Sequence, residues 1–351
     1  MDLYLLLDLF IAYFVEVLIG FPRFLPHPVK FIRWLIKNME KMIRAVIRML
    51  TEKKVKALGD DVVRSTRKAY RNERIAGALL AVLVIAVVVA IVIGILKACL
   101  IVHPILFHIV NTVFIYTCFA SRSIALEAYG VFDALKDRDV FKARNMMSVF
   151  MGNKTEDLDE DGIIKETVEN TAKSISDKVV APILYATVGS LLGIGAPLAY
   201  AYLTVSTLDS MVGYKNSEYK NIGFIPAKLD DIINFIPARL TGILIVIAAL
   251  FTGNNFKKGY SIMMRDRKKH KSPNFGYPVA SVSGVLGIRL GGPGMYFGEI
   301  KDKLIIGDDD NPLDIRNITQ TITLMYVTSL IAMGVLGITS VVAVILCNSL
   351  I

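Results

Sequence analysis

The sequence predicts an all-α integral membrane protein: a polytopic helical bundle of about four to six membrane segments, re-entrant ones included, with cytoplasmic loops and interfacial helices. Hydrophobic residues make up 54% of the 351 residues and mean hydropathy is +0.53, yet 20% of the residues are charged. Uncharged runs that could cross about 30 Å of hydrocarbon alternate with polar stretches. A soluble domain is less apolar than this chain, and a bundle of spans alone carries less charge.

The membrane segments are expected within a single membrane-embedded domain formed by residues 1–351. They are residues 3–20, 75–96, 98–121, 179–208, 240–256 and 320–347, and polar loops cover 21–74, 122–178, 209–239 and 257–318. Segments 3–20 and 240–256 are weaker. The first contains Asp8 and Glu16 and lacks the basic start and small-residue cleavage site of a signal peptide, so we expect it to be retained.

The charge of the loops predicts their side of the cell membrane. Loop 21–74 carries fifteen Lys and Arg residues against five acidic residues, which favours the cytoplasm. Residues 75–121 would then form a hairpin that turns outside at Lys97 and returns loop 122–178 to the cytoplasm. A glycine- and proline-containing break at 193–197 favours a re-entrant hairpin for 179–208. Segment 240–256 is short enough either to cross or to re-enter.

Several common chemistries are absent from the sequence. No Gly-Lys dipeptide occurs, which excludes a Walker A loop, and neither a zincin helix motif nor a Gly-x-Ser-x-Gly elbow is present. Cys99, Cys118 and Cys347 lack metal or redox spacing and are expected to pack as small hydrophobic residues. The net charge of +9 fits topology and anionic lipid in the bilayer better than nucleic acid. No permanently bound cofactor is indicated.

The first of four polar clusters is Pro26-His27-Pro28, which precedes a basic amphipathic stretch with Trp34 on its apolar side. The prolines favour an extended entry, and the helix after them is expected in the membrane interface. His27 is either a proton donor or anion contact, or a histidine that only shapes the turn.

The second cluster contains Glu169, Lys173 and Asp177, spaced four residues apart. On a helix these side chains would share one face. That face is either the wall of a site or a solvated stripe of ion pairs, and its position just before a membrane segment favours the wall.

The third cluster begins with Asp209, Ser210 and Tyr214 and continues at Asp230 and Asp231. Such carboxylates can hold Mg²⁺, which needs only one or two of them together with phosphate oxygens and water. Adjacent residues lie about 100° apart on a helix, so only one of Asp230 and Asp231 should face the site. Helix caps and surface charge are the alternative interpretation.

The fourth cluster joins His270, Lys271 and Asn274 to a glycine-rich stretch around Arg289. Glycines such as Gly291 and Gly292 let backbone amides approach an anion, and arginine can bind phosphate or carboxylate with two hydrogen bonds. A structural glycine loop is the alternative. His103 and His108 lie in an apolar run without an evident carboxylate partner, so they are expected to be packed or cavity-facing.

In this order the clusters resemble the CobD/CbiB family of cobalamin biosynthesis, the membrane-bound adenosylcobinamide-phosphate synthases. The resemblance covers most of the chain and rests on the segments Leu25-Pro26-His27-Pro28-Val29, Thr167-Val168-Glu169, Val180-Ala181-Pro182, Thr207 to Tyr214, Leu229-Asp230-Asp231, Pro237-Ala238-Arg239-Leu240, Ser272-Pro273-Asn274 and Arg289-Leu290-Gly291-Gly292-Pro293. Two elements depart from the family pattern: Phe21 stands where an Asp is usual, and Ala172-Lys173-Ser174 replaces an Ala-Glu-Asn-like element.

The resemblance implies ATP-dependent amide formation between a propionate carboxylate of adenosylcobyric acid and the amine of 1-amino-2-propanol or its O-phosphate. The corrinoid is then a substrate, ATP and Mg²⁺ are required, and other membrane-associated cobalamin assembly enzymes are expected partners. Our hypothesis for this reaction assigns metal binding to Asp209 with Asp230 or Asp231, phosphate binding to Arg289 and Lys271, and deprotonation of the amine to Glu169 or Asp177. Ser210 and Tyr214 join the catalytic group, and the remaining substrate-binding candidates are His27, Asn274, Arg239, Gly291 and Gly292.

Two other functions remain open from the residues alone. Broken helices with flanking charges also occur in transporters, and a non-catalytic assembly or regulatory protein could share the scaffold. Transporters place polar residues inside their spans, whereas here 179–208 and 318–351 contain no charged residue. The position of the polar motifs beside the membrane segments therefore favours the enzyme.

Overall fold

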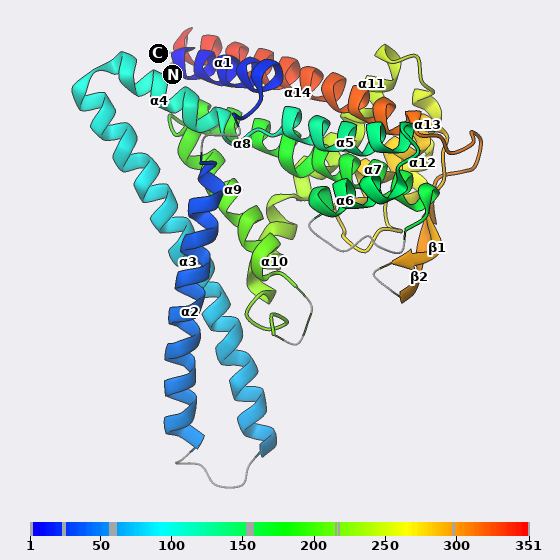
Figure 1. Cartoon of the computed structure of the whole chain (residues 1–351). Helices are drawn as coiled ribbons and strands as arrows, with labels where there is room; N and C mark the ends of the chain where they lie inside the picture. The colour runs from blue at the N-terminus through cyan, green and yellow to red at the C-terminus, as the bar shows by residue number, and fades with distance from the viewer. Residues whose placement is uncertain are drawn as a thin grey trace.

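The computed structural model describes residues 3–22, 26–55, 62–151, 158–214, 216, 218–296 and 299–349. Within them the chain is almost entirely helical, as predicted, and its only strands form one short antiparallel hairpin. The helices of the amino-terminal part are α1 (Leu3–Ile19), α2 (Pro28–Val55), α3 (Val62–Val102) and α4 (Pro104–Tyr116). Helices α2 and α3 pack together as a long arm that projects from the rest of the fold (Figure 1).

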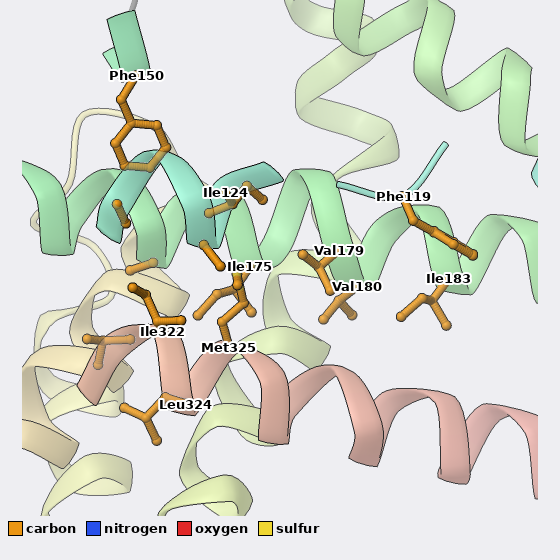
Figure 2. Close-up of a cluster of buried hydrophobic side chains, with 14 of the residues drawn as sticks. Phe119, Ile124, Phe150, Ile175, Val179, Val180, Ile183, Ile322, Leu324 and Met325 are labelled. Atoms are coloured by element: carbon orange, nitrogen blue, oxygen red, sulfur yellow. The ribbon is translucent and has the colours of Figure 1, made fainter. Parts of the chain in front are cut away.

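The body of the fold contains the remaining helices, with α14 running along one side of it (Figure 1). They are α5 (Ser121–Lys136), α6 (Val140–Met151), α7 (Glu160–Ser174), a π-helix η1 (Ile175–Val180), α8 (Ala181–Leu191), α9 (Gly195–Val212), α10 (Phe224–Ile233), α11 (Phe235–Phe251), α12 (Phe256–Asp266), α13 (Gly276–Leu286) and α14 (Arg316–Ser349). The buried core joins α5, α6, η1, α8 and α14 (Figure 2), and its labelled side chains are Phe119, Ile124, Phe150, Ile175, Val179, Val180, Ile183, Ile322, Leu324 and Met325.

Three helical stretches among the described residues are long and apolar enough to cross a membrane: Arg71–Val102, Pro104–Lys136 and Arg316–Cys347. A fourth results if α10 and α11, which meet at a bend of 44°, form one broken span. The polar stretches between the predicted membrane segments are themselves largely helical. Helix α2 and part of α3 occupy 21–74, and α12 and α13 occupy part of 257–318.

The predicted turn at Lys97 is wrong. Helix α3 continues through Lys97, whose exposed side chain does not interrupt it, and ends at Val102. The chain turns at His103 because the residue before a proline is disfavoured in the helical region, and here it is extended with φ −166° and ψ 136°. The His103 side chain accepts a hydrogen bond from the Ile105 N–H and so caps α4.

Residues 179–208 do not form one straight helix. Helices α8 and α9 pack against each other and are joined by a tight turn in which Gly193 has φ +77°, a conformation that glycine adopts at little cost. A Cβ on Gly189 would lie 2.7 Å from the Ile194 carbonyl oxygen, so the two helices approach closely beside the turn. The folded-back arrangement is as expected, and its place in the bilayer stays a prediction.

The glycine-rich stretch forms a β-hairpin, which the sequence analysis did not predict. Strand β1 (Leu290–Tyr296) pairs antiparallel with β2 (Glu299–Ile306), and a register shift occurs between Leu290 and Gly292. Gly291 and Gly292 have φ +73° and +87°, and a Cβ on Gly291 would lie 2.5 Å from the Leu304 carbonyl oxygen. The glycines therefore serve the backbone geometry of the hairpin.

Candidate active site

A cavity of about 490 Å³ lies between α7, the segment after α12 and the β-hairpin. Five lysines and two glutamates line it, an excess of three positive charges, together with His270 and Gly291. The lysines are Lys173, Lys268, Lys269, Lys271 and Lys303. Among the described residues Lys268 and Lys271 have no ion-pair partner, so their ammonium groups are available to an anion. We call this cavity the cationic cavity.

The carboxylates of the cationic cavity stand one helical turn apart on α7. Glu169 accepts from Lys173 Nζ at 2.5 Å, and Lys303 from β2 reaches both Glu166 and Glu169, the latter at 3.4 Å. Burial followed by the neighbouring negative charge of Glu169 raises the pKa of Glu166. Burial acts in the same direction on Glu169, but Lys173, His270 and Lys303 outweigh it and hold the pKa of Glu169 well below its usual range. Glu169 is therefore a stable anion.

His270 belongs to the same network. Its Nδ1 accepts a hydrogen bond from the Ser272 N–H at 2.9 Å, and its Nε2 lies 3.5 Å from Glu169 Oε1. Because Nδ1 is an acceptor there, the ring proton of the neutral form sits on Nε2 and points to Glu169. No individual role for His270 was predicted from the sequence, because its carboxylate partner lies 101 positions away in the chain.

A second group, the acidic group, consists of Asp177, Asp209 and Asp230 from η1, α9 and α10. The charges of Asp209 and Asp177 both act on the Asp230 carboxyl, so each of these two side chains lies within electrostatic range of Asp230. Asp177 lies in the π-helix, one turn beyond the Glu169–Lys173 pair. Its Oδ1 is shielded from solvent and has no hydrogen-bond partner among the described residues, and burial raises the pKa of this carboxyl.

A hydrogen-bond bridge fixes two members of the acidic group. The Asn234 side chain donates to Asp230 Oδ1 at 2.9 Å and accepts from the Tyr202 hydroxyl at 2.9 Å. The single proton of this hydroxyl is shared with the Asp177 carbonyl oxygen, which lies 2.7 Å from the hydroxyl oxygen. Asn234 and Tyr202 are buried, so these contacts connect η1 to α10 in a region with little competition from water.

Gly213 permits the position of the Asp209 carboxylate. A Cβ on Gly213 would lie 2.0 Å from Asp209 Oδ1, closer than any real contact, while the Gly213 N–H donates to the Asp209 carbonyl oxygen at 2.8 Å. Ser210 and Tyr214 flank this turn, and both are exposed, with Ser210 Oγ donating to the Ser206 carbonyl oxygen. Neither contacts the acidic group through a hydrogen bond in the described part of the chain.

Asp231 and Asn274 connect the acidic group to the cationic cavity. Asn274 Nδ2 donates to the Asp231 carbonyl oxygen at 2.8 Å, which ties the segment of Lys271 to the end of α10. The Asp231 side chain instead pairs with Lys228 at 3.4 Å near the surface. Asp230 is thus the member of the adjacent pair that faces the other carboxylates, as expected from their separation around the helix.

Besides Asn274, four predicted binding residues lie outside the lining of the cationic cavity. His27 sits in the turn before α2, with its ring 4.6 Å from that of Phe21, and its Nδ1 accepts from the Val29 N–H. Arg239 lies over the ring of Tyr277 at 4.6 Å. Arg289 faces Asp309 at 3.6 Å on the exposed side of the hairpin, and Gly292 is buried in β1.

Whether Mg²⁺ can bind at the acidic group depends on how few protein ligands the ion needs. Within the described ranges no group of three or more His, Cys, Asp or Glu side chains is placed to hold a metal ion. One or two carboxylates suffice when phosphate oxygens and water complete the shell. The negative charges around Asp230 and the unpartnered Oδ1 of Asp177 are favourable for a cation, so one or two carboxylates of the acidic group are candidates for holding the ion.

Some residues of the site were not predicted. Glu166 and Lys303 form a buried ion pair across 137 positions of sequence, and no local pattern relates them. Glu166 did carry a signal, because it is one turn before Glu169 on the same helix face. His108 was expected to lack a carboxylate partner, which is wrong: its Nδ1 lies 2.9 Å from Asp8 Oδ2 on α1.

Comparisons with known proteins identify a family that this chain resembles over most of its length. A family model described as CobD/Cbib protein matches residues 9–325. The chain is 36% identical to the "Cobalamin biosynthesis protein CobD" of Clostridium perfringens over 94% of this chain and 96% of the relative. It is 37% identical to the protein of the same name in Clostridium acetobutylicum, and 36% identical to the "Cobalamin biosynthesis protein CbiB" of Salmonella typhi, each over 92% of this chain and 94% of the relative. No solved structure matches.

Proposed function

The chain belongs to the CobD/CbiB family, and on that premise we propose that it acts in cobalamin biosynthesis as an ATP-dependent amide ligase. The reaction joins a propionate carboxylate of adenosylcobyric acid to the amine of aminopropanol or its O-phosphate. The observation that carries the proposal is the placement of a cationic cavity beside an acidic group along one stretch of chain, α7 and η1. Such a site can receive anionic phosphates and an amine together.

The chemistry explains why ATP is needed. A carboxylate resists attack by an amine until one oxygen becomes a leaving group. Transfer of a phosphoryl group from ATP to that oxygen releases ADP and gives an acyl phosphate. The amine then attacks the carbonyl carbon, inorganic phosphate leaves, and the nitrogen gives up a proton to a base. Cationic side chains stabilise the negative charge that builds on the phosphate oxygens.

Lys271 and Lys268 are assigned to the phosphates, because both line the cationic cavity without an ion-pair partner in the described chain. Arg289, the other phosphate residue implied by the family resemblance, faces Asp309 and receives no role in this scheme. Of the two bases considered, Asp177 is the better one. Its raised pKa and unpartnered Oδ1 suit proton transfer, whereas the depressed pKa of Glu169 makes that carboxylate a weak base.

Asp209 and Asp230 would hold Mg²⁺ from the acidic group. The ion would neutralise phosphate charge and polarise the phosphoryl group. Gly213 leaves room for the Asp209 carboxylate, and Asn234 orients Asp230. We place the cationic cavity and the acidic group on the cytoplasmic side of the cell membrane, where ATP is available, in keeping with the basic charge of loop 21–74.

The proposal is tested with purified protein in detergent, supplied with adenosylcobyric acid, Mg-ATP and either aminopropanol or its O-phosphate. Mass spectrometry should detect a corrinoid product heavier by one amide-linked amino alcohol, together with ADP. Comparison of the two amines at equal concentration identifies the preferred substrate. Absence of product, while membranes containing an active family member form it in parallel, would favour a transporter or a non-catalytic assembly protein.

A further inference from the structure

A second and larger cavity, of about 1040 Å³, lies between α1 and α4, away from the lysines of the cationic cavity. The two helices run in the same direction. Asp8 of α1 contacts His108 and Asn111 of α4 near their amino ends, and the Tyr116 hydroxyl donates to the Gly20 carbonyl oxygen at the other end. The walls between these contacts are apolar and include Ile11, Val15, Ile19 and Val113. The cavity therefore has one polar end and a long apolar body.

The polar end of the cavity is a cluster of side chains in contact with one another. Asp8 Oδ2 accepts from Asn111 Nδ2 at 2.8 Å and lies 2.9 Å from His108 Nδ1. The Asp8 side chain is 6% exposed and that of His108 27%, so the carboxylate is enclosed while the imidazole reaches the opening. Because a carboxylate only accepts, the proton between them sits on His108 Nδ1. In the neutral form of the ring His108 Nε2 then presents a lone pair, and no described residue hydrogen-bonds to it.

The charge at the polar end of the cavity indicates which kind of ligand it can bind. Of the residues that line the cavity, Asp8 is the only acidic one, and none is Lys or Arg. A carboxylate in an apolar surrounding is costly unless it is compensated, and here a histidine and an amide are its only partners among the described side chains. A cationic hydrogen-bond donor would complete the cluster, donating to the lone pair of His108 Nε2 and compensating the charge of Asp8.

The position of the cavity indicates where that cation comes from. Helix α4 belongs to the Pro104–Lys136 stretch that is long and apolar enough to cross a membrane, and the polar end of the cavity lies five residues after the turn at His103. A cavity with a charged group at one end and a long apolar body matches a membrane lipid better than a small soluble amine. We propose that the α1–α4 cavity binds a phospholipid with a primary ammonium head group, of the phosphatidylethanolamine type, with its ammonium at His108 and Asp8 and its acyl chains along α1.

The test compares phosphatidylethanolamine with phosphatidylcholine of identical acyl chains, because the second lipid keeps the positive charge but has no N–H to donate. Delipidated protein is incubated with each lipid, and retention is read by native mass spectrometry. We expect roughly tenfold stronger retention of phosphatidylethanolamine, the effect of one charge-assisted hydrogen bond. Asp8→Asn should remove most of this preference without abolishing the contact to Asn111. Equal retention of the two lipids, or an undiminished preference in Asp8→Asn, would overturn the proposal.

Two variants test the apolar body of the cavity. Ile11→Trp fills it, and we expect loss of lipid retention. Ile338→Trp places the same bulk at an exposed position of α14 that does not line the cavity and should retain lipid like the wild type. A matching loss in both variants would contradict a site between α1 and α4. Excess free ethanolamine should leave retention unchanged, and displacement of the lipid by it would show a small-amine site instead.

Discussion

Removing Lys303 should destabilise the protein through the two carboxylates that this lysine holds together. Lys303 pairs with Glu166 and Glu169, whose side chains are 5% and 6% exposed. Breaking a fully buried pair costs about 3–5 kcal/mol. The Lys303 side chain is 25% exposed, and Lys173 and His270 remain beside Glu169. We therefore expect Lys303→Met to lower the free energy of unfolding by about 2 kcal/mol, or roughly 4 °C in unfolding temperature.

The pH dependence of this loss follows from Glu166. Its pKa is raised in the folded protein by burial and by Glu169, and removal of Lys303 raises it further. A carboxyl whose folded pKa lies above its unfolded pKa binds more protons in the folded state, so stability falls as pH rises from the unfolded value of about 4.3 through the folded one. The defect of Lys303→Met should accordingly be small near pH 5 and large near pH 8.

Thermal unfolding in detergent at a series of pH values measures this effect. Lys268→Met is the matched control, because Lys268 lines the same cavity without an ion pair among the described residues, and its change should stay within about 0.5 kcal/mol. Adding Glu166→Gln to Lys303→Met removes the stranded charge and should restore most of the stability. A defect equal to that of Lys268→Met, or one that grows toward low pH, would refute the reasoning.

Three further predictions concern the acidic group and the arm. Asp209→Asn should lower the rate of amide formation at least roughly tenfold, because the metal would lose a charged ligand. An unchanged unfolding temperature would show that the variant is folded, and full turnover would exclude a metal role for Asp209. Gly77→Ala should lower the free energy of unfolding by about 1–3 kcal/mol, because a Cβ there would lie 1.9 Å from the Ile222 carbonyl oxygen. Gly94→Ala is the control and should be tolerated, because nothing lies within 4 Å of a Cβ at that position. Thermal unfolding of the two variants measures the difference. Burial raises the pKa of Asp177, so turnover should increase as pH rises through that pKa, and a pH profile unaltered in Asp177→Asn would contradict its role as base.

The sequence predicted those features that depend on local pattern. Apolar runs indicated membrane segments, the break at Gly193 indicated that α8 and α9 fold back, and the adjacent Asp230 and Asp231 were expected to face apart. Lys97 misled the placement of the first turn, because one charge near a helix end is tolerated when its side chain reaches solvent. The local preference set by Pro104 was the better signal.

Contacts across the chain could not be predicted in this way. Lys303 reaches Glu166 from a hairpin, and Tyr202, Asn234 and Asp230 form their bridge only because η1, α9 and α10 converge. The π-helix had no recognisable sequence signal, yet it carries Asp177. These arrangements depend on tertiary packing, so local periodicity carries no information on them.

Two glycines allow close main-chain contacts between the arm and the segments that lead to the acidic group. Gly77 lets the α3 backbone rest on the Ile222 carbonyl oxygen, and the next residue, Gly223, would with a Cβ lie 1.7 Å from the carbonyl oxygen of Val212. Val212 is three residues after Asp209 on the last turn of α9. Main chain thus presses on main chain from α3 to α9, without a flexible side chain to absorb movement. A displacement of the arm, which extends far beyond the body (Figure 1), would therefore be opposed by main-chain contacts that continue to the last turn of α9, the turn that follows Asp209.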